Sequence, residues 1–78
     1  MNALDAALLA AHAADDRPKL IALYTQAANE AATAEAEGFY LTHAYVFALE
    51  AGHPAAPALR ERLVKAGREE PLPPNSKV

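Results

Sequence analysis

The chain has 78 residues, a formal net charge of −3 and no cysteine. This length allows one small domain whose core supplies a net stability of only a few kcal/mol, and the lack of cysteine excludes a disulfide framework, a thiolate zinc site and a cysteine nucleophile. Hydrophobic residues make up 53% of the chain, but 21 of them are alanine. Because alanine favours helix and buries little area, the composition predicts a thin, all-α domain of closely packed helices.

The charge is distributed unevenly along the chain. Residues 1–50 carry seven acidic and two basic side chains, whereas residues 51–78 carry three acidic and five basic ones. An acidic majority is a poor match for a phosphate backbone, so nucleic-acid binding is disfavoured. The only basic group consists of Arg60, Arg62, Lys65 and Arg68.

The first residues and the hydrophobic runs bear on localisation. No basic residue precedes the first apolar stretch, and Asp5 lies inside that stretch, which disfavours a secretory signal. No apolar run approaches the roughly 20 residues that a bilayer span requires. These features predict a cytoplasmic protein without a membrane span.

The first two helical segments follow from capping signals. Helix one is predicted from about Ala3 to Ala14, with Asn2 as its N-cap. Asp15 or Asp16 caps helix two, which is predicted over Pro18 to Glu35 because proline suits the first turn of a helix.

Glycine and proline residues predict the boundaries of the remaining segments. Helix three is predicted from about Phe39 to Ala51, between a turn at Gly38 and a stop at Gly52. Helix four is predicted to start in the stretch "GHPAAP" and to end near Gly67. Residues 68–78 contain three prolines in four residues and little to bury, so they are predicted to form an extended or disordered tail.

Short connections between these segments predict two antiparallel helical hairpins in a single all-α domain of residues 1–67. The second hairpin carries a similar pattern to the first, at spacings of 33 and 35 residues. In the first helices, Leu8, Leu9 and His12 correspond to Leu41, Thr42 and Tyr45. In the second helices, Leu20, Tyr24 and Ala28 correspond to Ala55, Leu59 and Leu63.

These spacings bracket the tetratricopeptide period of about 34 residues, and several stretches resemble that family. The stretch "LTHAY", from Leu41 to Tyr45, is similar to the Leu-Gly-x-x-Tyr core of a tetratricopeptide first helix. The stretch "LIALYTQAANEA", with Tyr24 at the aromatic position, looks like a second helix, and "ALEAGHPAAPALRERL" resembles the glycine turn and the helix that follows.

The resemblance covers nearly all of residues 1–67 and implies a protein-binding scaffold without chemistry of its own. Such units bind a peptide or helix in the groove that their first helices line. Because two repeats leave open ends, the resemblance also implies a capping partner, a dimer mate or a larger complex. A plain four-helix bundle is the alternative architecture.

Helix three is apolar around most of its circumference. One side continues the expected core stripe with Leu41, Ala44, Tyr45, Ala48 and Leu49. The other side carries Tyr40, His43 and Phe47 at positions i, i+3 and i+7. This second side is either buried by the other helices or an amphipathic strip for a partner helix or peptide. The residues expected to bind the partner are Phe39, Tyr40, His43, Val46 and Phe47.

The sequence shows little that predicts catalysis. His12, His43 and His53 lack a metal-binding spacing, and nothing requires His12 and His43 to converge. Three carboxylates lie near the end of the predicted helix two, and we interpret them as a solvated group: Glu30, Glu35 and Glu37. No nucleophile elbow, P-loop or dinucleotide fingerprint is present.

We therefore expect no catalytic residue, no metal and no cofactor. The function indicated is a non-enzymatic interaction module, either a small adaptor or an accessory subunit of a larger complex. Its partner would be another protein, with self-association left open. The alternative is a regulatory protein that binds a small ligand or a metal through His43 and neighbouring tyrosines.

Overall fold

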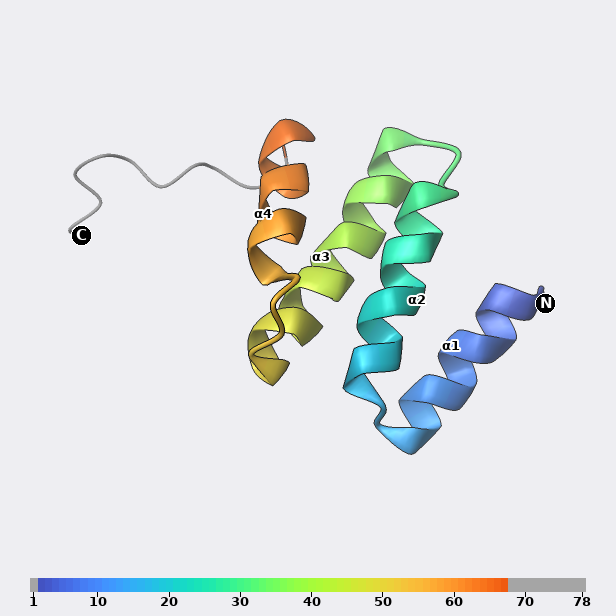
Figure 1. The fold of residues 1–78 in the computed structure, drawn as a ribbon. Helices are drawn as coiled ribbons and strands as arrows, with labels where there is room; N and C mark the ends of the chain where they lie inside the picture. The colour runs from blue at the N-terminus through green and yellow to red at the C-terminus, as the bar shows by residue number, and fades with distance from the viewer. Residues whose placement is uncertain (1, 68–78) are drawn as a thin grey trace.

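The structure is a computed structural model, and it describes residues 2–67. This part of the chain contains helices α1 (Ala3–Ala14), α2 (Arg17–Asn29), α3 (Ala34–Ala51) and α4 (Ala56–Lys65) and no strand. Consecutive helices run antiparallel, as two hairpins (Figure 1). The predicted all-α fold is confirmed, while the tail predicted for residues 68–78 lies outside the described residues.

The ends of α1 and α2 are set by short polar side chains. The Asn2 side chain accepts a 2.8 Å hydrogen bond from the backbone N–H of Asp5, and the Asp16 side chain accepts one of 3.2 Å from that of Lys19. Each bond satisfies an N–H that has no partner within its helix. Asp15 ends α1 in the left-handed conformation, with a φ of 53°, which aspartate tolerates better than most residues.

The predicted boundary between helices two and three is wrong. Helix α2 ends at Asn29, six residues earlier than expected, and α3 already begins at Ala34, so that Gly38 lies buried inside α3 instead of in a turn. The reason is the Thr33 hydroxyl, which caps α3 by accepting a 3.0 Å bond from the N–H of Ala36. A helical glycine costs about 1 kcal/mol, which is similar to what one such cap contributes.

The four helices form a single layer in chain order (Figure 1). Within residues 2–67, the pairs whose backbones pack together are α1–α2, α2–α3 and α3–α4, and the contact between α2 and α3 is the most extensive. The largest fully buried side chains are Leu20 of α2, Leu41 of α3 and Leu63 of α4. Helix α1 buries only Ala11, so it is the most weakly anchored helix.

The core is apolar throughout the described residues. No polar or charged residue of this part is buried. The main cluster joins α2, α3 and α4 and consists of Ile21, Ala28, Leu41, Ala44, Ala48, Leu59 and Leu63. Its alanines come mostly from α3, where small side chains allow neighbouring helices to approach closely.

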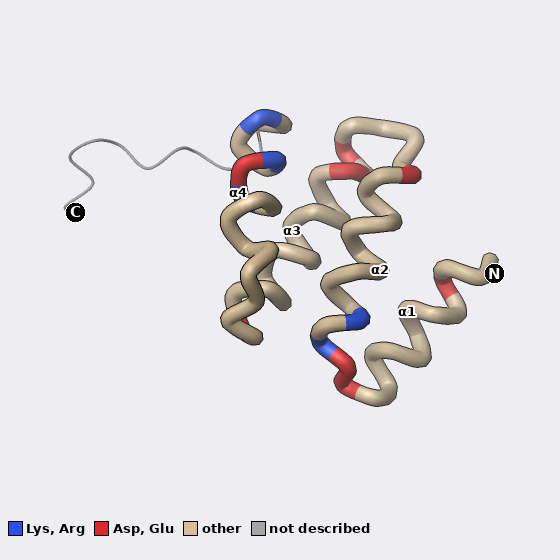
Figure 2. Tube along the Cα trace, viewed as in Figure 1, with Lys and Arg blue, Asp and Glu red and all other residues tan. Residues whose placement is uncertain are grey.

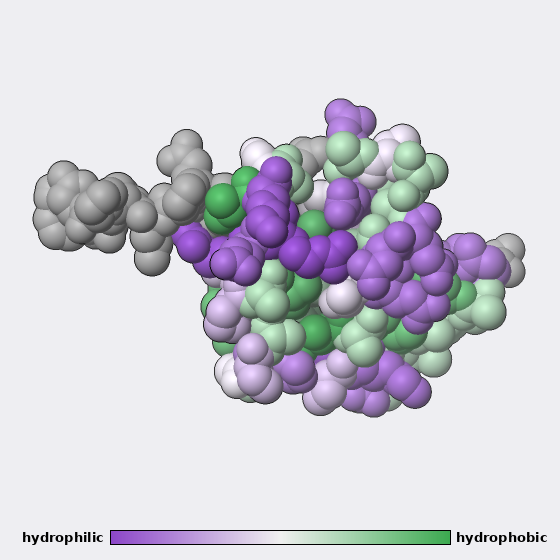
Figure 3. Space-filling view, turned by 45° about the horizontal axis from the view of Figure 1, so that its top comes forward, coloured by the Kyte–Doolittle hydropathy of each residue, from purple (hydrophilic) through white to green (hydrophobic). Residues whose placement is uncertain are grey.

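One face of this layer carries a band of polar side chains. When the molecule is turned so that the end where α3 begins comes forward, hydrophilic residues form a band across the surface, and hydrophobic residues are visible beside this band (Figure 3). Ion pairs join Arg17 to Glu50 at 3.5 Å and Arg62 to Glu37 at 3.4 Å. Because all four side chains are substantially exposed, each pair contributes less than about 1 kcal/mol. None of the helices in the described part is long and apolar enough to cross a lipid bilayer.

Candidate functional site

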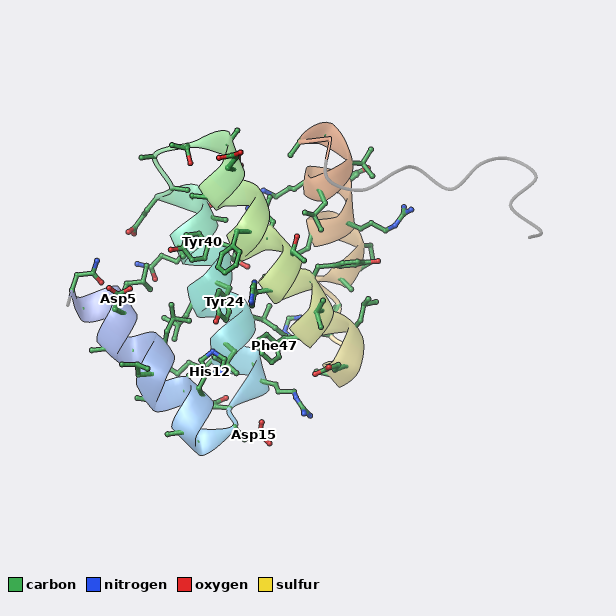
Figure 4. The ribbon with its side chains drawn as sticks, turned by 180° about the vertical axis from the view of Figure 1, so that it is seen from behind. Asp5, His12, Asp15, Tyr24, Tyr40 and Phe47 are labelled. Atoms are coloured by element: carbon green, nitrogen blue, oxygen red, sulfur yellow. The ribbon has the colours of Figure 1, made fainter. Side chains whose placement is uncertain are left out.

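Six ring side chains from three helices contact one another on one face of the layer. We call them the aromatic cluster, and they are His12 of α1, Tyr24 of α2, and Phe39, Tyr40, His43 and Phe47 of α3. Figure 4 shows His12, Tyr24, Tyr40 and Phe47 together between α1 and α3. The chain thus brings residues that are up to 35 positions apart into one group.

Tyr24 lies at the centre of the aromatic cluster. Its ring stacks on His43 at a centroid distance of 5.0 Å and on Phe47 at 6.0 Å, and it lies 6.3 Å from the ring of Tyr40. Aromatic pairs at such distances contribute about 0.5–1.5 kcal/mol beyond their buried area. The predicted strip of Tyr40, His43 and Phe47 therefore contacts the protein's own α2.

The Tyr24 hydroxyl connects α2 to α1. It lies 2.8 Å from Nε2 of His12, and the His12 ring also meets the edge of Phe47 at a centroid distance of 5.9 Å. Burial raises the pKa of the Tyr24 hydroxyl above its ordinary value, and the neighbouring Tyr40 raises it further. Both effects disfavour the tyrosinate form, so Tyr24 stays a neutral hydrogen-bonding group.

His43 has a defined orientation at the edge of the aromatic cluster. Its Nδ1 lies 2.9 Å from the backbone oxygen of Phe39. Since a carbonyl oxygen only accepts, Nδ1 carries the proton, and in the neutral ring Nε2 is then the acceptor. The His43 ring also packs 4.4 Å from the ring of Phe39. A histidine held in this way offers its remaining nitrogen in a fixed direction.

A shallow groove of about 250 Å³ runs along α3 beside His43. The residues that line it are Thr42, His43, Val46, Phe47 and Glu50. All of them come from one helix, and the groove is open to solvent. It is a surface depression suited to an inserted side chain, rather than an enclosed cavity of the kind that holds a small molecule.

Three large apolar side chains of α3 remain exposed next to this groove. They are Phe39, which is 57% exposed, Val46 at 43% and Leu49 at 55%, and we call them the exposed strip. At 100° per residue they fall within an arc of about 80° on the helix surface. The expectation that Leu49 belongs to the core is therefore wrong, because Leu41, Ala44 and Ala48 already define the buried side of α3.

The structure divides the five predicted partner-binding residues into two groups. Val46 is exposed, and so is Phe39 at the edge of the aromatic cluster, whereas Tyr40, His43 and Phe47 are half-buried within the cluster. The spacing of Phe39, Val46 and Leu49 at i, i+7 and i+10 is a signal in the sequence that the pattern of Tyr40, His43 and Phe47 obscured. No sequence signal predicted the convergence of His12 and His43 on Tyr24.

The remaining polar groups considered from the sequence lie apart. Glu35 and Glu37 stand in the first turn of α3, where the helix dipole favours negative charge, while Glu30 ends α2. The predicted carboxylate group at the end of one helix is therefore wrong. His53 caps a turn by accepting a 3.0 Å bond from the N–H of Ala55.

Two further findings concern ligands and relatives. Among residues 2–67, no three or more histidine, aspartate or glutamate side chains form a group that could hold a metal ion. No protein-family model, curated protein or solved structure matches this chain.

Proposed function

We propose that this protein is a non-enzymatic interaction module, a small adaptor or an accessory subunit, that binds a helix or peptide of another protein through α3. The observation that carries the proposal is the exposed strip of Phe39, Val46 and Leu49 on the longest helix of the described chain. Single exposed apolar residues are ordinary, whereas three of them in one sector of the same helix favour an interaction surface.

The geometry of α3 fits a helical partner. The exposed strip runs over eleven residues of helix, from Phe39 to Leu49, or about 15 Å along its axis. A partner helix presents apolar side chains at i, i+3 or i+4, and i+7 over a similar length. The groove beside His43 and Val46 gives one such side chain a place to insert.

The aromatic cluster supports this proposal by holding α3 firmly. Tyr40 and Phe47 pack against Tyr24 and the main core, so the side of α3 that faces away from them keeps a constant orientation. A binding surface on a rigid helix loses little conformational freedom when a partner binds. The half-buried rings of the cluster then support the binding surface, and the exposed strip, which includes Phe39, makes the contact.

The resemblance to tetratricopeptide units supports the same function. In that arrangement α1 and α3 are the first helices of two repeats, and such units bind their ligands along their first helices. The exposed strip lies on α3, in the same helix as the "LTHAY" stretch that carries the resemblance.

The proposal is tested with a photo-crosslinking amino acid placed at Val46 of the full chain in extract of the native host. We expect one discrete crosslinked product, which mass spectrometry identifies. Excess unlabelled parent protein should abolish this product, whereas excess Val46→Asn variant should not. The matched control position is Leu9, which is 57% exposed on α1 and away from the strip.

The control decides between specific binding and general stickiness. Crosslinks from Leu9 that equal those from Val46 in identity and yield would contradict the proposal. So would competition by the Val46→Asn variant as effective as that by the parent. A melting temperature of Val46→Asn close to that of the parent shows that the variant is folded.

A further inference from the structure

Carboxylates stand at both ends of the exposed strip. Glu35 lies four residues before Phe39 and is exposed in the first turn of α3. Glu50 follows Leu49 and lines the same groove as Val46. At 100° per residue, Glu35 falls in the sector of the helix surface that carries the strip, and Glu50 falls about 20° beyond the edge of that sector that Phe39 forms. The three apolar side chains, with the exposed Thr42 between Phe39 and Val46, therefore have a carboxylate near each end.

The part of the chain from residue 2 to residue 51 is also acidic, whereas α4, which packs on α3 as well, carries three basic side chains and one carboxylate. From residue 2 to residue 51 the chain carries seven carboxylates and only two basic side chains, Arg17 and Lys19, which both lie at the start of α2 (Figure 2). Arg17 approaches Glu50 at 3.5 Å, but the two side chains are 44% and 51% exposed. A pair this exposed is weak, so the Glu50 carboxylate remains accessible to a second cation.

This charge pattern argues against a second copy of the chain on the strip. In an antiparallel pair of α3 helices centred on the strip, Glu35 of one copy comes within about one turn of Glu50 of the other. In a parallel pair, each glutamate faces its own counterpart. Both arrangements bring like charges together, which opposes association.

We infer that the segment bound on α3 is a basic amphipathic helix, an inference that rests on the proposed function. Its apolar side chains at i, i+3 or i+4, and i+7 contact Phe39, Val46 and Leu49. Its lysine or arginine side chains lie beyond each end of this apolar stretch, opposite Glu35 and Glu50. Since those glutamates are 15 residues apart, the two basic ends are separated by about 22 Å of helix.

The test uses two synthetic peptides of about 18 residues, a length that spans this distance as a helix. Both share one amphipathic leucine and alanine pattern, and one carries lysines at its ends where the other carries glutamates. Fluorescence anisotropy measures their binding to the full chain. We expect the lysine peptide to bind at least tenfold more tightly at low salt, and the difference to shrink at high salt as exposed charges are screened.

Variants of the protein locate the contact. Glu35→Gln and Glu50→Gln should each weaken binding of the lysine peptide two- to fivefold. The matched control is Glu61→Gln, which changes net charge equally at an exposed position of α4, and it should have no comparable effect. Val46→Asn should weaken binding about tenfold, whereas Leu9→Asn should leave it unchanged.

The possible outcomes separate this inference from the proposed function. Equal binding of both peptides, with Val46→Asn weakening both, overturns the basic partner but keeps a helix-binding strip. If Glu35→Gln and Glu61→Gln weaken binding of the lysine peptide equally, the attraction depends only on the net charge of the protein, and the inference is overturned. Sedimentation that shows a dimer of the chain, dissociated by Val46→Asn, assigns the strip to a second copy and overturns it as well.

Discussion

Tyr24 connects three helices through one side chain. Its ring stacks on His43 and Phe47 of α3, and its hydroxyl lies 2.8 Å from His12 of α1. Helix α1 otherwise buries little, since Ala11 is its one buried residue. The phenol hydroxyl therefore matters more for the attachment of α1 than a single hydrogen bond does in a larger core.

The raised pKa of Tyr24 predicts a loss of stability at alkaline pH. The folded state keeps the phenol neutral because burial and Tyr40 disfavour its ionisation, whereas the unfolded state ionises near pH 10. The contribution of the neutral Tyr24 phenol to the free energy of unfolding is fully present below about pH 10. It is lost as the pH rises from there through the higher pKa of Tyr24 in the folded state. Urea unfolding between pH 8 and 11 measures this decline.

The control for this prediction is Tyr24→Phe. At neutral pH the variant should be less stable by about 0.5–1.5 kcal/mol, because it lacks the hydrogen bond to His12. Above pH 10 its stability should decline less steeply than that of the parent. Parallel curves for the two proteins would mean that Tyr24 does not titrate differently in the folded and unfolded states.

At the scale of the helices, the sequence predicted those ends that a nearby cap or glycine determines. Asn2 begins α1, and Gly52, at a φ of 62°, ends α3, as expected, because these signals act within a few residues. The α2–α3 boundary was mispredicted because two local signals compete there. Gly38 suggested a turn, while Thr33 offered a cap, and the burial of Gly38 inside the layer depends on tertiary packing.

The candidate site was predicted only in part, because the packing of one helix on another cannot be predicted from local sequence signals. Periodicity showed that α3 has apolar residues on two sides, but it could not show which neighbours cover them. One of the two sides is covered by Tyr24 of α2, whose ring contacts Tyr40 and Phe47. With that side occupied, Leu49 is left at the surface beside Val46 and Phe39.

The capping role of Thr33 gives a prediction with a matched control. Thr33→Ala removes the acceptor for the N–H of Ala36, so it should destabilise the protein by about 1 kcal/mol, or roughly 4–8 °C in melting temperature. Thr42→Ala makes the same chemical change inside α3, where the hydroxyl only donates back to the Gly38 carbonyl. It should be neutral or slightly stabilising, since alanine is the better helix former.

Thermal unfolding of both variants checks the assignment of this boundary. Equal effects at Thr33 and Thr42 would show that the cap does not contribute. In that case the start of α3 would have to be held by the ion pair between Glu37 and Arg62 or by the core alone.

At the scale of the whole molecule, the helices differ in how firmly they are held. The backbone of α3 packs on both α2 and α4, whereas that of α1 packs on α2 only and reaches α3 just through the ring contact of His12 with Phe47. Most of the buried apolar side chains also belong to α2, α3 and α4. The layer is thus well supported in its middle and weakly supported at the edge that α1 forms.

This difference predicts a gradient of backbone protection. Amide hydrogens of α1 should exchange fastest among the four helices, and those in the middle of α3 slowest, because local opening of α1 exposes little apolar area. Tyr24→Phe should accelerate exchange in α1 more than in α4. Hydrogen exchange followed by NMR measures both, and uniform protection across the helices would contradict the gradient.

The packing of each helix against its neighbours in sequence has a consequence for the kinetics of folding. Contacts between consecutive helices require only short loops to close, and proteins dominated by such local contacts fold within microseconds to milliseconds. The pairing of α2 with α3 is the most extensive, which favours it as the nucleus onto which α4 and α1 dock separately. A pair of α2 and α3 that forms first leaves one side of each helix uncovered until α1 and α4 dock on it.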